Sequence, residues 1–159
     1  MAERGTLPVD PELLAPVTMR LAGNGLGYAH SEVRVRGHTV MIDEPPERGG
    51  GDVGPTPTET FLLSLIGVTN VILRRLAKRD GIAIHSLGVE LEAVLDRRGV
   101  WLAEAIPLPW HEIRLRLTIA TDADDARLAI WKEDLPKFSP IHTVLREAGT
   151  PVLETWVRG

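Results

Sequence analysis

A long apolar helix is the feature of this sequence that most constrains its fold. Thr56 and Glu59 form a capping box around Pro57, because a Thr hydroxyl, a Pro at the first helical position and a Glu three residues on are typical of a helix start. Apolar residues recur at three- and four-residue spacing from there to Leu76, and Gly81 is a stop signal. The helix should have about six turns at ~3.6 residues per turn. It carries so few charges that we expect it to be buried on most sides.

The residues before this helix predict a small β-meander. Strands are expected at 17–22, 28–35 and 38–43, with a Gly-Asn-Gly turn at 23–25. Glycine and proline fill the next segment, 44–54, so we expect a flexible connection there. Its glycines are not followed by the Gly-Lys-Ser/Thr of a phosphate-binding loop, so a phosphate site is not expected.

The residues after the long helix predict further strands and two more helices. Alternation of apolar and polar side chains marks the two longest strands. The expected elements are strands at 84–95 and 110–120, a short strand beginning at 100–102, helices at 122–134 and 140–148, and a last strand at 151–157. This order indicates a single α+β domain over residues 17–159. A loosely held, proline-containing arm should precede it at residues 1–16.

Charge and hydropathy argue against several partners. The formal net charge is -4 at pH 7 and the basic residues are scattered, so we expect no nucleic-acid partner. We find no run of ~20 uninterrupted apolar residues and no secretory signal at the N-terminus. We therefore expect no membrane partner and a cytoplasmic location.

The chain contains no cysteine. Disulfides, thiolate metal sites, iron–sulfur clusters and thiol nucleophiles are all excluded by this one fact. Its five histidines also lack the spacing of helical zinc sites. We expect neither a metal nor a cofactor.

Two motifs make this sequence similar to the OsmC/Ohr superfamily. The first, GPTPTE at 54–59, leads through an apolar helix to GVT at 67–69, and it resembles the family's G-P-[ST]-P-x-E, helix, G-C-[TS]. The second, SPIHTVL at 139–145, is similar to the family's C-P-[IV]-x-x-x-L. The motifs occur in the family's order, and the resemblance extends over about residues 24–157. The chain is thus identified as a cysteine-less member of the OsmC-like branch.

The resemblance implies an OsmC-like fold, with antiparallel sheets packed around a long central helix in an intertwined homodimer. It also implies sites at the subunit interface, where family members reduce hydroperoxides in a stress response. The positions of the family's two cysteines are Val68 and Ser139 here. Thiol peroxidases need a thiolate that becomes a sulfenic acid and is recovered as a disulfide, so this activity should be absent. The family's site arginine cannot be matched to Arg20, Arg34 or Arg36.

Three functions remain open at this point. In the first, the chain keeps an interfacial pocket near Val68 and Phe61 that binds a small apolar ligand without catalysis. In the second, Ser139, His142 and a carboxylate such as Glu59 perform hydrolytic or acid-base chemistry. Helix capping already accounts for both Ser139 and Glu59, which weighs against this second function. In the third, the protein is a structural or partner-binding module, and side-chain packing completely fills the position of the family's site. The first is the leading hypothesis, so catalysis is not expected.

Overall fold

The computed structural model describes residues 4–159 and divides into two compact units. One unit is residues 9–64, and the other is residues 65–159 together with the N-terminal residues up to Pro8. The long helix α1, Pro57–Asp80, begins in the first unit and continues in the second. The single domain at 17–159 and the loose arm at 1–16 stay predictions, and residues 1–3 of that arm lie outside the described part.

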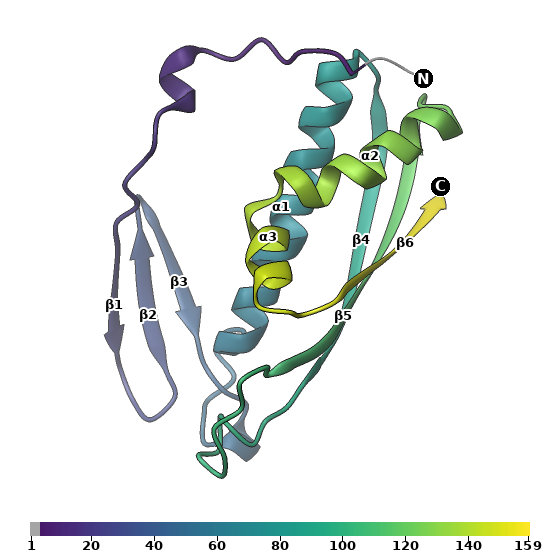
Figure 1. Ribbon diagram of the computed structural model, residues 1–159. Helices are drawn as coiled ribbons and strands as arrows, with labels where there is room; N and C mark the ends of the chain where they lie inside the picture. The colour runs from purple at the N-terminus through teal and green to yellow at the C-terminus, as the bar shows by residue number, and fades with distance from the viewer. Residues whose placement is uncertain (1–3) are drawn as a thin grey trace. The chain divides into compact units, whose positions relative to one another are not determined.

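The unit of residues 9–64 is built on an antiparallel sheet (Figure 1). Its strands are β1, Leu21–Gly25, β2, Ser31–Val35, and β3, His38–Ile42, in the order β1-β2-β3. The predicted meander is confirmed, but the turn predicted at 23–25 is wrong. These residues pair with β2 as part of β1, and the chain reverses after Gly25. The hydrogen-bonded register of the strands outweighs the local preference of Gly-Asn-Gly for a turn.

Asp43 orders the glycine-rich loop that follows β3. Its buried carboxylate accepts hydrogen bonds from the backbone N–H groups of Glu44 at 2.9 Å, Gly51 at 2.8 Å and Val53 at 3.3 Å. The loop passes so close to itself that a Cβ on Gly50 would overlap the Glu44 carbonyl. The sequence predicts a flexible connection here, whereas the structure shows an irregular loop that is ordered by hydrogen bonds to the Asp43 side chain. The loop contains a short 3-10 helix, η2, Pro46–Arg48, and another, η1, Pro11–Leu14, precedes β1.

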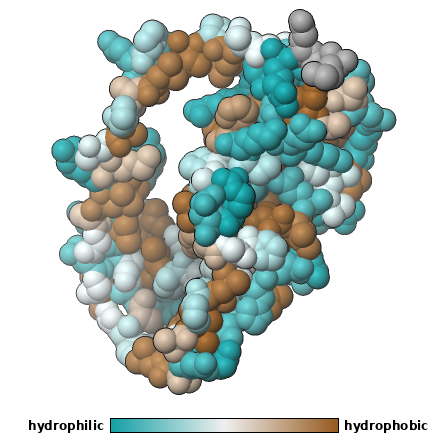
Figure 2. Space-filling model, viewed as in Figure 1, coloured by the Kyte–Doolittle hydropathy of each residue, from teal (hydrophilic) through white to brown (hydrophobic). Residues whose placement is uncertain are grey.

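The unit of residues 9–64 exposes an unusual number of apolar side chains. Figure 2 shows hydrophobic residues along the segment that leads into β1 and over the small sheet. The large apolar residues exposed in this unit are Val9, Leu13, Leu14, Val17, Met19, Leu21, Leu26, Tyr28, Val40, Val53 and Leu63. Exposed apolar side chains that gather in this way are typical of surfaces that bind a partner.

The unit of residues 65–159 contains a second sheet, in the order β4-β5-β6. β4, Ile84–Leu95, and β5, Trp110–Thr121, are antiparallel neighbours, whereas β6, Val152–Arg158, runs parallel to β5. A parallel pair needs a long crossover connection. Helices α2, Asp125–Phe138, and α3, Pro140–Glu147, supply it (Figure 1). These strands and helices confirm the predicted order of elements.

Residues 100–102 do not begin a strand, contrary to expectation. They form turns closed by backbone hydrogen bonds from Trp101 N to Arg97 O at 3.1 Å and from Ala103 N to Arg98 O at 2.9 Å. The guanidinium of Arg97 also lies over the Trp101 ring, 5.7 Å from its centroid. Local turn contacts thus replace the strand pairing that the apolar triplet suggested.

The core of this unit is a single apolar layer on one face of the sheet. β5 contributes four side chains at alternate positions, each at most 1% exposed, while Arg114 and Arg116 between them point to the other, exposed face. The helices bury their own apolar residues in the same unit. The buried apolar residues are Leu65, Ile72, Leu73, Leu76, Ala77, Ile84, Ile113, Leu115, Leu117, Ile119, Ala123, Leu128, Trp131, Leu135 and Leu145.

Helix α1 is buried on one face only, so the expectation of burial on most sides is wrong for the single chain. Leu63 and Val71 are 53% and 42% exposed, and Gly67 lies on the same face. Among residues 4–159, α1 is the one helix long and apolar enough to cross a membrane, a test that core helices of soluble proteins also pass. The apolar part of this exposed face is a candidate interaction surface.

Two buried carboxylates tie the end of α1 to α2. Asp134 accepts from Arg79 at 2.9 Å and from Arg4 at 3.2 Å, although its own side chain is only 2% exposed. Asp80, 1% exposed, accepts from the Trp131 indole N–H at 2.7 Å and pairs with Arg79 at 2.9 Å. Burial alone would raise the pKa of both carboxyls, but their hydrogen bonds and the neighbouring guanidinium charges outweigh it and hold each pKa below its usual range.

We predict that Asp134→Asn lowers the free energy of unfolding by about 2 kcal/mol at neutral pH, because a charge-assisted buried contact is lost. Urea unfolding measures this difference. A carboxyl with a depressed folded-state pKa stabilises the protein above its unfolded pKa of about 3.9, and this contribution disappears as the pH falls through the lower folded value. The difference between wild type and variant should therefore shrink below about pH 4.

Glu133→Gln is the matched control, since Glu133 is adjacent on α2 but 66% exposed and should change stability by less than about 0.5 kcal/mol. An equal effect of the two substitutions would contradict a structural role for the buried cluster.

Candidate functional site

Ser139 occupies the corner between α2 and α3, and the local sequence dictates that corner. Pro140 disfavours helical geometry in the residue before it, so Ser139 is extended, with φ -88° and ψ 115°, and α2 ends there. Pro140 then takes the first position of α3, where its missing N–H costs nothing. The Ser139 Oγ accepts from the backbone N–H of His142 at 3.3 Å, which is the predicted N-cap.

The structure brings the side chains of Ser139 and His142 together. The Ser139 Oγ lies 2.7 Å from His142 Nδ1, and the two residues are 0% and 3% exposed. This contact is the arrangement in which a serine hydroxyl can pass its proton to an imidazole. The hydroxyl is nevertheless enclosed by protein and already caps a helix, so no substrate carbonyl can reach it in this conformation.

The carboxylate beside His142 belongs to Glu154 of β6. Its Oε1 lies 3.3 Å from His142 Nε2, while its Oε2 accepts from the Trp156 indole N–H at 2.8 Å. The contact with Nε2 is an ion-pair distance without the alignment of a hydrogen bond. Sequence reasoning missed Glu154. The sequence feature that could have pointed to it is the alternation along the last strand, where Glu154 shares one side with Val152 and Trp156. A charged residue on the less exposed side of a strand needs a polar partner.

Glu59, the carboxylate suggested by the sequence, is engaged elsewhere. It lies in the unit of residues 9–64, where its Oε2 accepts from the Thr56 backbone N–H at 2.8 Å and its own N–H donates to Thr56 Oγ1 at 3.2 Å. The predicted capping box is therefore present. Hydrogen bonds from Thr56, and then the charge of Arg48, lower the pKa of Glu59 in spite of partial burial. Arg48 itself forms an ion pair with Glu44 at 2.8 Å.

Val68 lies on α1, half-buried, beside the exposed Gly67. Its side chain has no group that can attack, donate or accept, so its position offers only apolar surface. Phe61, two turns earlier on the same helix, is also half-buried. Within residues 4–159 no cluster of three or more His, Asp or Glu side chains is arranged to hold a metal ion.

The fold and these residues can be compared with known proteins. A family model described as OsmC-like protein matches residues 49–154, which include both motif positions Val68 and Ser139. The chain belongs to the OsmC-like family. No curated protein matches its sequence significantly.

Solved structures support the same fold at low sequence identity. An OsmC-like protein from Mycoplasma pneumoniae superposes with a TM-score of 0.73 at 14% identity, covering 90% of this chain and 99% of that one. A Vibrio cholerae OsmC-like protein of unknown function gives 0.71 at 9% identity, covering 89% and 100%. An organic hydroperoxide resistance protein from Legionella pneumophila gives 0.68 at 14%, covering 90% and 98%. The protein is therefore a cysteine-free member with the family's α+β fold, and it lacks the thiols needed for thiol-dependent peroxide reduction.

We predict that Ser139→Ala lowers the free energy of unfolding by about 2 kcal/mol, because it removes a helix cap and leaves the buried His142 Nδ1 without its partner. Ser64→Ala is the control: Ser64 is an exposed serine on α1, and its loss should change stability by less than about 0.5 kcal/mol. Chemical denaturation of both variants measures the difference. Equal stabilities would show that the corner does not depend on the hydroxyl.

Proposed function

We propose that this protein is a non-catalytic OsmC-like homodimer that binds a small apolar ligand near Val68. The observation that carries the proposal is the absence of any cysteine from the chain. The motif resemblance assigns the family's two cysteine positions to Val68 on α1 and to Ser139 at the α2–α3 corner. Val68 offers only apolar surface at the first of these positions. At the second, Ser139 is buried and serves as the N-cap of α3. Such a site can hold a ligand but cannot exchange electrons with it. A cytoplasmic location stays part of this proposal.

The exposed face of α1 supports the homodimer. Leu63, Gly67 and Val71 follow one another at four-residue intervals, which places them on one side of the helix. A single chain leaves this small, apolar stripe uncovered, and close helix contact favours small residues at its centre. A second copy of the same chain is the occupant that the family's dimeric architecture suggests.

The alternative is hydrolysis by Ser139, His142 and Glu154. The 2.7 Å contact between Ser139 Oγ and His142 Nδ1 favours it, and Glu154 supplies the third group. The complete burial of Ser139 counts against it, because a nucleophile must reach the substrate. Labelling of Ser139 by a fluorophosphonate would favour hydrolysis over the proposed binding function.

We predict that the wild-type protein binds cumene hydroperoxide without reducing it in the presence of a dithiol. Calorimetry measures the binding and a ferrous-oxidation assay measures the remaining peroxide. Val68→Arg should abolish binding, because it places a charge in apolar surface, whereas Val94→Arg on the exposed β4 position should not. Rapid peroxide loss would refute the argument from missing thiols, and the absence of binding would favour a filled, purely structural site.

We predict that Val71→Lys converts a dimer of 17.4 kDa chains into monomers, because it puts a charge into the stripe on α1. Analytical ultracentrifugation gives the mass, and circular dichroism checks that the variant is folded. Val94→Lys is the matched control at a similarly exposed valine on β4, at 49% against 42%. A monomeric wild type, or equal behaviour of the two variants, would exclude α1 as the dimer interface.

A further inference from the structure

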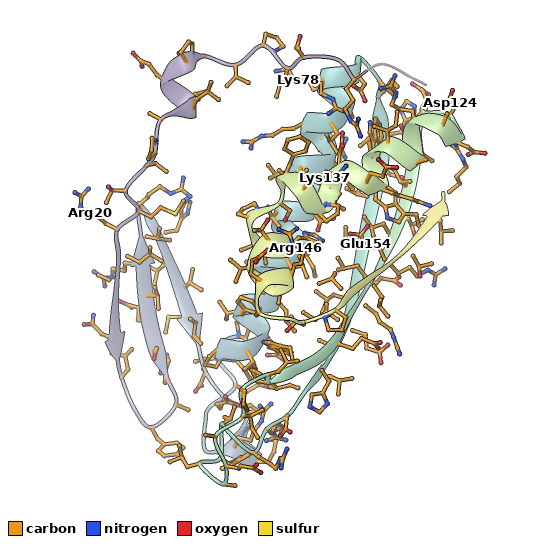
Figure 3. All side chains as sticks on the ribbon, viewed as in Figure 1. Arg20, Lys78, Asp124, Lys137, Arg146 and Glu154 are labelled. Atoms are coloured by element: carbon orange, nitrogen blue, oxygen red, sulfur yellow. The ribbon has the colours of Figure 1, made fainter. Side chains whose placement is uncertain are left out.

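A cavity of about 560 Å³ lies between α2, α3 and β6, within the unit of residues 65–159. This volume falls in the range of small-molecule sites, ~300–1,000 Å³. Pro136, Pro151 and Val152 give it apolar walls. The charged and polar members of its lining are His142, Lys132, Arg146, Glu154 and Thr150. Figure 3 shows two of them, Arg146 on α3 and Glu154 on β6.

His142 supplies a buried hydrogen-bond donor to this cavity. The His142 side chain is only 3% exposed. Its Nε2 makes no hydrogen bond with the described protein groups. The Ser139 hydroxyl is 2.7 Å from Nδ1, and the Glu154 carboxylate lies 3.3 Å from Nε2. A carboxylate repels a nitrogen lone pair, so the proton belongs on Nε2 while Ser139 donates to Nδ1. The Glu154 carboxylate is not aligned to accept this hydrogen bond, so Nε2–H can donate to an acceptor in the cavity, and buried donors of this kind are normally satisfied.

The charges of the lining favour an anionic acceptor. Lys132 is held over the Trp156 ring, 5.7 Å from its centroid, and within residues 4–159 it forms no ion pair with a carboxylate. Arg146, at 57% side-chain exposure, forms an ion pair with the exposed Glu147, its one carboxylate partner among the described residues. Glu154 brings one negative charge, but its Oε2 is committed to Trp156, and the lining carries two cations, of which Arg146 shares its charge with the solvent-exposed Glu147.

We propose that this cavity binds a small organic carboxylate. Lys132 and Arg146 hold the carboxylate head, His142 Nε2–H donates to one of its oxygens, and the proline and valine walls contact its aliphatic body. The site differs from the apolar ligand position proposed near Val68, because all of its residues come from α2, α3, β6 and the segment between α3 and β6. It does not depend on a dimer.

The test uses hexanoate and its neutral counterpart hexan-1-ol with the full-length protein. Calorimetry gives the affinities, and the His142 ring resonances in NMR report whether the ligand reaches Nε2. We expect hexanoate to bind at least about tenfold more tightly than hexan-1-ol and to shift the His142 resonances. Equal binding of the two probes, no binding of hexanoate, or unshifted His142 resonances would each overturn the proposal.

Two lysines on α2 test whether hexanoate binds in this cavity or is attracted by positive charge in general. Lys132→Met should weaken hexanoate binding about tenfold, while its side chain still packs on Trp156. Lys137→Met should leave the affinity unchanged, because Lys137 is exposed and outside the cavity lining. An equal loss of hexanoate affinity in both variants would show that the attraction is nonspecific electrostatics and would overturn the proposed site. Hexanoate binding should persist in Val71→Lys, so failure of the dimer proposal and failure of this one give different results.

Discussion

The buried row of side chains on β5 is the constraint on which the unit of residues 65–159 depends. β5 is the middle strand of its sheet, hydrogen-bonded to β4 on one edge and β6 on the other. Its inward residues, from Ile113 to Ile119, are nearly free of solvent contact. Helices with an apolar face must cover that row, because exposed β-branched and leucine side chains would lose the hydrophobic free energy of folding. The position of α2, and with it the corner at Ser139, follows from this requirement.

The same corner shows how an OsmC-like fold can form without cysteine. A cysteine at position 139 and a serine there can both precede Pro140 and start α3, but only the serine oxygen makes a strong cap to the His142 N–H. Val68 likewise preserves an apolar helix surface. Val68 and Ser139 both fit the local packing, and the OsmC-like architecture is present in a chain without the thiols that thiol-dependent peroxide reduction needs.

Much of the fold follows from periodicity, whereas the polar site does not. The alternation in β4 and β5 and the capping box of α1 are properties of neighbouring residues, and their elements are found where the sequence predicts them. Glu154 meets His142 only because β6 returns parallel to β5 after two helices, a tertiary contact that no local pattern encodes. Strand pairing also explains the error at residues 23–25, where the register with β2 outweighs residue preference. The error at 100–102 has a different cause, because local turn hydrogen bonds there outweigh the β preference of the apolar triplet.

The parallel register of β6 also restricts how this chain can change. Glu154 pairs across from Leu115 of β5, with Leu153 and Thr155 on the more exposed side of the strand. Because side chains alternate along a strand, adding or deleting one residue in the connection between α3 and β6 would exchange these two sets. The acid would move out to solvent, and Leu153 after an insertion, or Thr155 after a deletion, would take its place beside His142. The length of that short connection therefore sets the charge beside the histidine, and insertions should be tolerated far better in the turns after β4 than there.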